Sequence, residues 1–513
     1  MSTDSGPLSR RDALGLGLLL ASAAACSSSK TVDVEELPLY ELRRKLANRE
    51  ITARQLTQAY LDRIATVDPL THAIIELNPD ALKIADELDR VSNPTGALHG
   101  IPILIKDNID TGDRMMTTAG SLALEGPPAL ADSGVAKRLR DAGAVILGKT
   151  NLSEWANIRS SRSTSGWSGR GGQTRNPYSL DRNCSGSSSG SGAAASASLC
   201  AAAIGTETDG SIVSPAAING LVGIKPTVGL ISGKGIIPIS HTQDTAGPMA
   251  RTVRDAAILL GAIQEPREGV PTDYMRYLDD QGLRGARIGV ARQFWSGNGD
   301  IIKLGNDAIE VMRRLGADVV EDVKLDASYG DAEFDIMMYE LKAGLNAYLA
   351  TRTGLTVKTL AGVIDFNTRN AAREMPYFAQ ENLLKAQEKG SLQSKPYLDA
   401  LEKCRKLSRA DGIDGALAKY KLDAIFSITD GPAWLTDYIN GDHFTASCST
   451  PAAVAGYPHI TVPAGFVHGL PIGVSFFGTA WTEAKLIRYA YSFEQNTKAR
   501  RKPGYVPAVH VNT

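Results

Sequence analysis

A stretch built from glycine, serine and alanine, residues 184–227, limits most strongly how this chain can fold. Residues 185–192 are only glycine and serine, so they cannot fill a core, but their backbone N–H groups can come close to a ligand. In residues 205–211, Gly210 directly precedes a serine, in a turn from which a hydroxyl and several N–H groups can point the same way. The small residues 193–203 tolerate a helix, so we expect a buried helix that joins two loops at one end of a sheet.

The rest of the chain alternates between helical and strand patterns. Thr52 and Gln55 form a capping-box signal for a helix that we expect Asp68 and Pro69 to end. Apolar residues at helical spacing predict further helices, and short apolar runs predict buried strands. The expected helices are residues 80–88, 135–142, 253–263 and 483–495, and the expected strands are residues 101–105, 145–147, 287–291, 424–428, 459–463 and 471–477. This alternation predicts the α/β class.

Lys106 directly follows the strand expected at residues 101–105. A lysine at this position is either the first solvated residue beyond the strand or an amine held at the carboxyl edge of the sheet, where open α/β sheets gather ligands. The strand pattern by itself leaves both interpretations open.

Composition argues against several classes of function. The 55 lysines and arginines are balanced by 56 aspartates and glutamates, so the chain lacks a basic excess and we expect no nucleic-acid partner. The five cysteines show no CxxC pair and no Cys/His ligand spacing, which argues against a zinc site or a disulfide framework. We therefore expect neither a metal nor a cofactor. The cysteines are Cys26, Cys184, Cys200, Cys404 and Cys448.

The N-terminus has the pattern of an export signal. Arg10 and Arg11 precede an apolar run, residues 14–25, which is too short to span a membrane but is typical of a twin-arginine (Tat) signal peptide. We expect residues 1–25 to be the signal peptide and residues 26–35 to be a tether. Residues 23–26 resemble a bacterial lipoprotein processing site, which would make Cys26 a lipid anchor, and a cleaved signal that releases a soluble protein is the alternative. The predicted location is the periplasm or the cell envelope.

Residues 326–416 are charged and helical in pattern, without strand signals or glycine motifs. We interpret them as a helical layer that is inserted into a single domain, residues 36–505, and that borders the entrance of an active site. Trp155, Trp167, Trp434 and Trp481 are candidates either for an apolar acyl pocket or for core packing.

A hydrolase needs a nucleophile, a base and donors for the developing oxyanion. Serines are plentiful, but none of the seven histidines lies in a strong catalytic motif. Residues 186–190 fit the G-x-S-x-G pattern of α/β-hydrolases, yet the preceding residues 177–184 are polar and cannot form the strand that this pattern requires. A lysine remains as the base, provided that burial lowers its pKa until the neutral amine is populated.

Three motifs resemble those of the amidase signature enzymes. Residues 100–108 resemble the strand that ends in a lysine, residues 185–191 the glycine and serine loop, and residues 207–212 with 223–227 the nucleophile loop and the segment after it. The resemblance extends over most of residues 37–503, is weakest at 326–416, and is closest to the bacterial peptide amidase branch. It implies the amidase signature fold, a large mixed central β-sheet covered by helices on both faces.

The resemblance also implies a Ser-Ser-Lys triad. Ser211 would attack the amide carbonyl, and neutral Lys106 would draw the proton through Ser187, which precedes Ser211 by the family's separation of 24 residues. It implies a cis peptide bond before Ser187. The backbone N–H groups of the residues leading to the nucleophile would form the oxyanion hole. These residues are Thr208, Asp209, Gly210 and Ser211.

Four residues depart from the family pattern: Ser185 and Ser189 replace glycines, and Glu207 and Asp209 replace the commoner aspartate and glycine. A serine is tolerated at such a position if its φ is negative. Because the peptide amidase branch looks similar at these positions, we interpret them as marks of a subfamily.

The predicted function is therefore that of an exported serine amidohydrolase. It would cleave carboxylic amide C–N bonds through an acyl-enzyme and release ammonia or an amine from a small-molecule or peptide amide, with C-terminal peptide amides as the suggested substrates. The alternatives are acyl transfer to another amine, an A-type component of an amidotransferase, and a catalytically inactive amidase-like binding protein. We expect a monomer or a homodimer.

Overall fold

The computed structural model describes residues 32–92, 96–326 and 328–509. The predicted signal peptide and the lipid anchor at Cys26 lie outside the described residues. The contacts divide the chain into residues 1–33 and residues 34–513, and the fold below is that of the second unit. None of the helices in the described part of the chain is both long enough and apolar enough to cross a bilayer.

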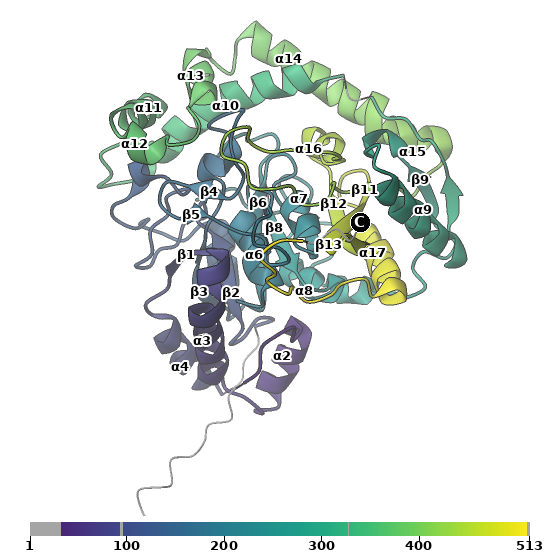
Figure 1. Cartoon of the computed structure of the whole chain (residues 1–513), viewed down its shortest axis with the longest axis horizontal. Coiled ribbons are helices and arrows are strands. Elements are labelled where there is room, and N and C mark those ends of the chain that lie inside the picture. Colours follow the sequence, from purple (N-terminus) through teal and green to yellow (C-terminus); the bar gives the residue numbers. More distant parts are fainter. Residues whose placement is uncertain (1–31, 93–95, 327, 510–513) are drawn as a thin grey trace, which may run out of the picture. The chain divides into compact units, whose positions relative to one another are not determined.

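A mixed sheet of eleven strands, counted over the described residues, is the centre of the fold (Figure 1). Its strands lie in the order β1-β3-β2-β6-β8-β7-β12-β13-β11-β9-β10. β2 is parallel to both β3 and β6, and β9 is parallel to both β10 and β11, whereas the remaining neighbours are antiparallel. The strands are β1 (Ile74–Leu77), β2 (Pro102–Lys106), β3 (Val145–Thr150), β6 (Ala202–Glu207), β7 (Val222–Lys225), β8 (Thr245–Ala250), β9 (Arg287–Val290), β10 (Asp318–Val320), β11 (Ala424–Ile428), β12 (His459–Val467) and β13 (Leu470–Phe477), and a separate ribbon joins β4 (Trp167–Ser168) to β5 (Gly172–Gln173).

Both faces of the sheet are covered. All residues of β2, β3, β6, β7, β8, β11 and β13 are buried, which requires protein on either side of the strands. The covering helices are α2 (Leu39–Ala47), α3 (Ala53–Thr71), α4 (Ala81–Asp89), α5 (Gly134–Asp141), α6 (Ser189–Ser196), α7 (Val213–Ile218), α8 (Val253–Ile263), α9 (Gly299–Arg314), α10 (Gly330–Thr351), α11 (Leu360–Arg369), α12 (Ala371–Glu374), α13 (Glu381–Glu388), α14 (Lys395–Arg405), a π-helical turn (Lys406–Ile413), α15 (Asp414–Tyr420), α16 (Thr450–Ala455) and α17 (Glu483–Thr497). The predicted α/β fold with a large mixed sheet is confirmed.

Helix α3 begins as predicted and ends later than predicted. The Thr52 hydroxyl accepts from the Gln55 N–H, and the Gln55 side chain accepts from the Thr52 N–H, so the capping box is formed. The helix continues through Pro69 to Thr71 and stops where His72 takes a left-handed conformation, with φ 51°. Its end is therefore set by this cap and not by the proline.

The expectation of one helix over residues 193–203 is wrong. Helix α6 begins four residues earlier, at Ser189, and ends at Ser196, and the chain then enters β6 at Ala202. β6 lies between β2 and β8, and α6 is buried along its whole length. Small residues suit a buried helix and a central strand equally, so composition could not separate the two.

Residues 328–420 contain α10 to α15, the green helices along one edge of the sheet in Figure 1. Leu345 of α10 and Leu360 at the start of α11 belong to a hydrophobic cluster that also contains Leu124 and Trp155. The helical layer is thereby packed against the loops that follow β2 and β3. The predicted domain boundaries stay predictions.

Candidate active site

Lys106 is the last residue of β2 and is completely buried. Its Nζ donates to Ser187 Oγ at 2.7 Å, to Ser188 Oγ at 3.0 Å and to Thr206 Oγ1 at 2.9 Å. The structure therefore excludes the solvated interpretation of Lys106 and places its amine against the loop that holds the predicted shuttle serine.

Burial lowers the pKa of Lys106 to about 7, and the negative charges of Asp244 and Glu207 oppose this shift. At neutral pH a large fraction of the amine is consequently unprotonated. A neutral lysine that is hydrogen-bonded to a hydroxyl has what a general base requires.

Ser187 lies at the start of a buried loop, and the peptide bond between Gly186 and Ser187 is cis, as the resemblance implies. A Cβ atom at residue 186 would overlap Ser153 Oγ and would approach Ser165 Oγ to 3.0 Å. Glycine is therefore required here by close packing, which explains one of the glycines that made this stretch conspicuous.

Ser211 lies on the loop between β6 and α7 and lines a cavity of about 360 Å³, the catalytic cavity. Gly210 has φ +76°, a left-handed conformation that favours glycine, and a Cβ atom there would lie 3.0 Å from Ser449 Oγ. The Glu207 carboxylate accepts from the N–H groups of Ile212 and Val213 at 2.7 and 3.0 Å, so it ties β6 to the start of α7. This bracing fixes the loop that carries the serine.

The same loop presents backbone donors. Within residues 32–92, 96–326 and 328–509, the N–H groups of Asp209, Gly210 and Ser211 donate to no protein acceptor. The Thr208 hydroxyl donates to Asp244 Oδ1 at 2.6 Å, and Thr450 Oγ1 donates to Asp209 Oδ2 at 2.7 Å. Side chains thus hold the loop while its N–H groups remain available to an oxyanion.

The two predicted serines belong to neighbouring loops. The Ser188 N–H donates to the Ser211 carbonyl at 3.2 Å, which joins the shuttle loop to the nucleophile loop. Among the described residues, no hydrogen bond connects the Ser187 and Ser211 hydroxyls. Catalytic hydrogen bonds often form only once the substrate is bound, so the proton path between these two serines stays a prediction.

Three residues around Lys106 were not predicted from the sequence. Ser188 and Thr206 accept hydrogen bonds from its amine, and Asn108 Nδ2 donates to Thr206 Oγ1 at 3.0 Å. A protonated lysine has three donors, so a buried one needs more acceptors than a single serine. A polar residue inside the small, apolar β6 was the signal that could have pointed to Thr206.

Ser185 does not meet the expected condition of a negative φ. Its φ is +60°, and its hydroxyl forms a hydrogen bond of 2.6 Å with Ser214 Oγ, which in turn donates to Asp430. The serine hydroxyl thus gains a buried partner in a conformation in which glycine would be the easier residue.

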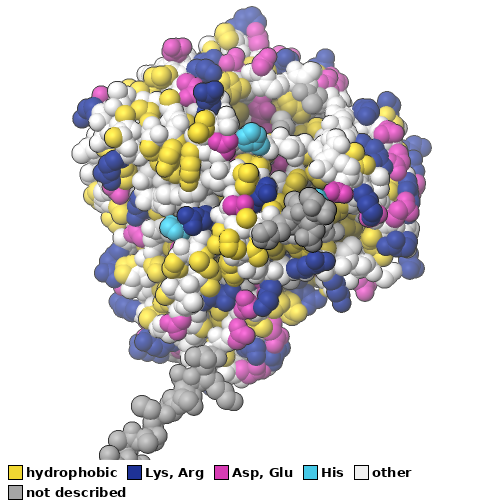
Figure 2. Space-filling model, viewed as in Figure 1, with side chains coloured by type: hydrophobic (Ala, Val, Ile, Leu, Met, Phe, Trp, Pro, Cys, Tyr) yellow, Lys and Arg dark blue, Asp and Glu magenta, His cyan; other side chains and the backbone are white. Residues whose placement is uncertain are grey.

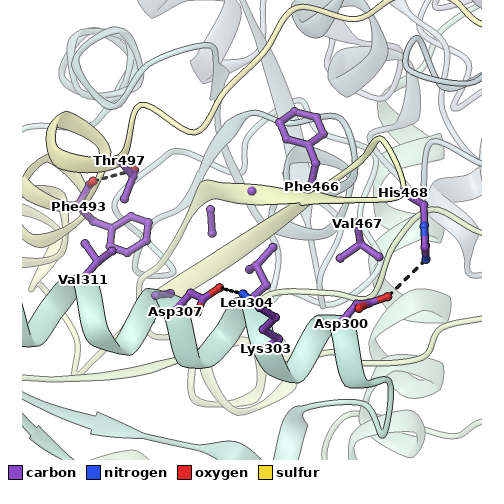
Figure 3. Close-up of a pocket in the computed structure, with 13 residues that line it drawn as sticks. Asp300, Lys303, Leu304, Asp307, Val311, Phe466, Val467, His468, Phe493 and Thr497 are labelled. Carbon is purple, nitrogen blue, oxygen red and sulfur yellow. Dashed lines mark hydrogen bonds and ion pairs between the residues drawn. The ribbon is translucent and has the colours of Figure 1, made fainter.

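A separate surface cavity of about 430 Å³ lies between α9, β12 and α17 (Figure 3). Its charged side chains are paired with one another: Lys303 Nζ lies 2.6 Å from Asp307, and His468 Nε2 lies 3.3 Å from Asp300. Because this cavity is lined by no serine, it is a weaker candidate than the cavity at Ser211. Figure 2 shows basic and acidic side chains interspersed over the face that it draws.

Comparisons with known proteins agree with this geometry. A family model described as Amidase matches residues 55–487. A probable amidase of Arabidopsis thaliana is 40% identical over 511 residues, which cover 95% of each chain. The crystal structure of the native peptide amidase from Stenotrophomonas maltophilia has 48% sequence identity and a TM-score of 0.87, over 92% of this chain and 99% of that one. The A-type component of the glutamyl-tRNA(Gln) amidotransferase of Thermoanaerobacter pseudethanolicus is 33% identical, over 92% of this chain and 99% of that protein.

Proposed function

This chain belongs to the amidase family and is a hydrolase of carboxylic amide C–N bonds, and we propose that it acts on C-terminally amidated peptides through an acyl-enzyme on Ser211. The observation that carries the catalytic part is the buried Lys106 amine, 2.7 Å from Ser187 Oγ and with a pKa lowered to about 7. The substrate class is supported by the similarity to peptide amidase over nearly the whole of both chains.

In the proposed reaction, Ser211 Oγ attacks the carbonyl carbon while its proton passes through Ser187 Oγ to neutral Lys106. The N–H groups of Asp209, Gly210 and Ser211 bind the resulting oxyanion, and donors of this kind contribute about 2.7–4 kcal/mol each. The proton returns through Ser187 to the amide nitrogen, the C–N bond breaks and ammonia leaves. Water then attacks the Ser211 ester by the same proton route, which releases the carboxylic acid and restores the serine.

Covalent labelling tests the nucleophile. A fluorophosphonate should add one label to the wild-type protein, seen by intact-mass spectrometry, and none to Ser211→Ala. Ser447→Ala is a matched control, because Ser447 lines the same cavity and should leave labelling unchanged. Labelling that persists in Ser211→Ala would reject Ser211 as the nucleophile.

Ammonia release from amidated peptides, aliphatic amides and aryl amides tests the substrate class. Release from amidated peptides by the isolated protein supports hydrolysis. Release only when a partner protein is added would favour the amidotransferase role, and transfer of the acyl group to an added amine in preference to water would favour an acyltransferase. Labelled Ser211 without turnover of any amide would favour a binding protein.

The export of the protein is part of the proposal and is supported by the sequence of residues 1–26. Fractionation of cells that produce the full chain should recover it in the envelope or the periplasm. Incorporation of radioactive palmitate that disappears in Cys26→Ser would establish the lipid anchor, whereas cytoplasmic recovery would reject export.

A further inference from the structure

A second cavity, of about 310 Å³, lies beside the catalytic cavity, and we call it the side-chain cavity. The segment between β7 and β8 supplies its apolar wall. Ile231, Ile237 and Ile239 in this wall are buried, and Val228 and Ile236 are half-buried. The volume and the apolar lining are those of a small ligand site.

The side-chain cavity adjoins the nucleophile loop. Ala156, Thr208 and Ile239 line both this cavity and the catalytic cavity, so they form the boundary between the two. Thr208 is only three residues before Ser211 on the same loop. A substrate whose carbonyl carbon lies at Ser211 therefore has its nearest substituents within reach of the side-chain cavity.

The carboxylates in the wall of this cavity are engaged within the protein. Asp244 accepts from the Thr208 hydroxyl at 2.6 Å and from the N–H groups of Ile239 and Ser240 at 2.8 and 2.9 Å. Glu207 accepts from two N–H groups at the start of α7. Because these carboxylates hold the loops in place, the isoleucine wall is the main surface available to an occupant.

The tryptophans suggested by the sequence play no part in either wall. Trp155, Trp167 and Trp434 are buried in the protein, and the ring of Trp481 lies 3.8 Å from the Arg267 guanidinium. An apolar group that enters beside Ser211 thus meets branched aliphatic side chains, not aromatic ones, in the side-chain cavity.

We propose that the side-chain cavity binds the apolar side chain of the C-terminal residue whose carboxamide is hydrolysed, an inference that rests on the proposed function. In a C-terminal amide the leaving nitrogen carries only hydrogens and needs no cavity, so the occupant comes from the acyl side of the scissile bond. The enzyme is therefore selective for amides of leucine or phenylalanine over the amide of glycine. Selection by an apolar pocket of this kind changes kcat/KM on the order of 10- to 100-fold.

The test compares kcat/KM for ammonia release from the N-acetyl amides of phenylalanine, leucine, glycine and lysine. Phenylalanine and leucine amides should exceed glycine amide by about 10- to 100-fold in the wild type. Ile236→Trp should fill the cavity and remove most of this preference while glycine amide is hydrolysed as before. Leu130→Trp is the control, because Leu130 is 77% exposed and lines neither cavity, so the preference should be kept. If Ile236→Trp does not fold, Val228→Trp applies the same change at the other half-buried wall position.

Several results overturn the proposal: equal kcat/KM for the phenylalanine and glycine amides, a preference for the lysine amide, or an equal loss on both amides in the variant that fills the cavity. A loss in that variant confined to acetanilide relative to acetamide also overturns it, because the cavity would then receive the amine part of the substrate.

Binding separates failure of this inference from failure of the proposed function. Hydrolysis without a side-chain preference rejects the cavity assignment alone. If no amide is hydrolysed, calorimetry with Ser211→Ala still decides: tighter binding of the phenylalanine amide, lost when Ile236→Trp is added, supports the cavity and rejects hydrolysis. Absence of both hydrolysis and selective binding rejects both proposals.

Discussion

Thr206→Val is expected to shift the acid limb of the pH–rate profile to lower pH. Lys106 Nζ donates to Thr206 Oγ1 at 2.9 Å, in addition to its bonds to Ser187 and Ser188. Valine is close to threonine in size, so the main loss is one hydroxyl acceptor next to the amine. This loss affects the protonated form of the lysine more than the neutral form, because a charged donor makes the stronger hydrogen bond.

The size of the shift follows from the difference between these two bonds. A hydrogen bond to a charged group contributes about 1.5–3 kcal/mol and one between neutral groups about 0.5–1.5 kcal/mol. The difference, about 1–1.5 kcal/mol, corresponds to roughly one pKa unit. The pKa of Lys106 should therefore fall from about 7 by about one unit. Because the neutral amine is the active form, kcat/KM should keep its maximum down to a lower pH.

The assay is kcat/KM for ammonia release over roughly pH 5–9, with an uncharged N-acetyl amide so that the substrate does not titrate. Thr206→Ser keeps the hydroxyl and should keep the wild-type acid limb. An unchanged limb in Thr206→Val, a shift to higher pH, or an equal shift in Thr206→Ser would refute the assignment of this limb to Lys106.

Asp244 provides a second check on the same limb. Burial raises its pKa to about 6, so it titrates in the same range, and its negative charge raises the pKa of Lys106. Asp244→Asn should consequently move the limb to lower pH and keep it. Disappearance of the limb in this variant would show that Asp244, and not Lys106, controls it.

Three further outcomes are expected. Lys106→Met should lower kcat/KM for ammonia release by about 10²–10⁴-fold without lowering the melting temperature, because a buried amine is removed along with the base; a loss below about tenfold would contradict the role of a base. Gly210→Ala should lower kcat by about 100-fold or more, since alanine is strained at φ +76° and its Cβ would press on Ser449 and displace the oxyanion donors. Thr52→Ala should reduce the free energy of unfolding in urea by about 1 kcal/mol and leave kcat/KM unchanged, because it removes only the cap of α3; a Gln55→Ala variant should show a smaller loss.

The predictions that succeeded depend on neighbours in the chain. The apolar run before Lys106 forms β2 within one residue of its expected bounds, and helix α8 has the predicted bounds of residues 253–263. The capping box of Thr52 and Gln55 forms because its two hydrogen bonds span only three residues. The glycine and serine stretch proved to hold the loops around Lys106 because close backbone packing, as at Gly186, leaves no room for a larger residue.

Amino-acid order alone therefore determined the element types, the α/β class and the candidate residues Lys106, Ser187 and Ser211. Only the tertiary structure decided whether Lys106 is solvated, since its hydrogen-bond partners come from residues 81 to 100 positions away in the chain. It also decided that Ser185 takes a positive φ and that β6 replaces the end of an expected helix. The physical reason is that solvation, and with it the pKa of an amine, is a property of the packed surroundings, and these do not exist until distant segments meet.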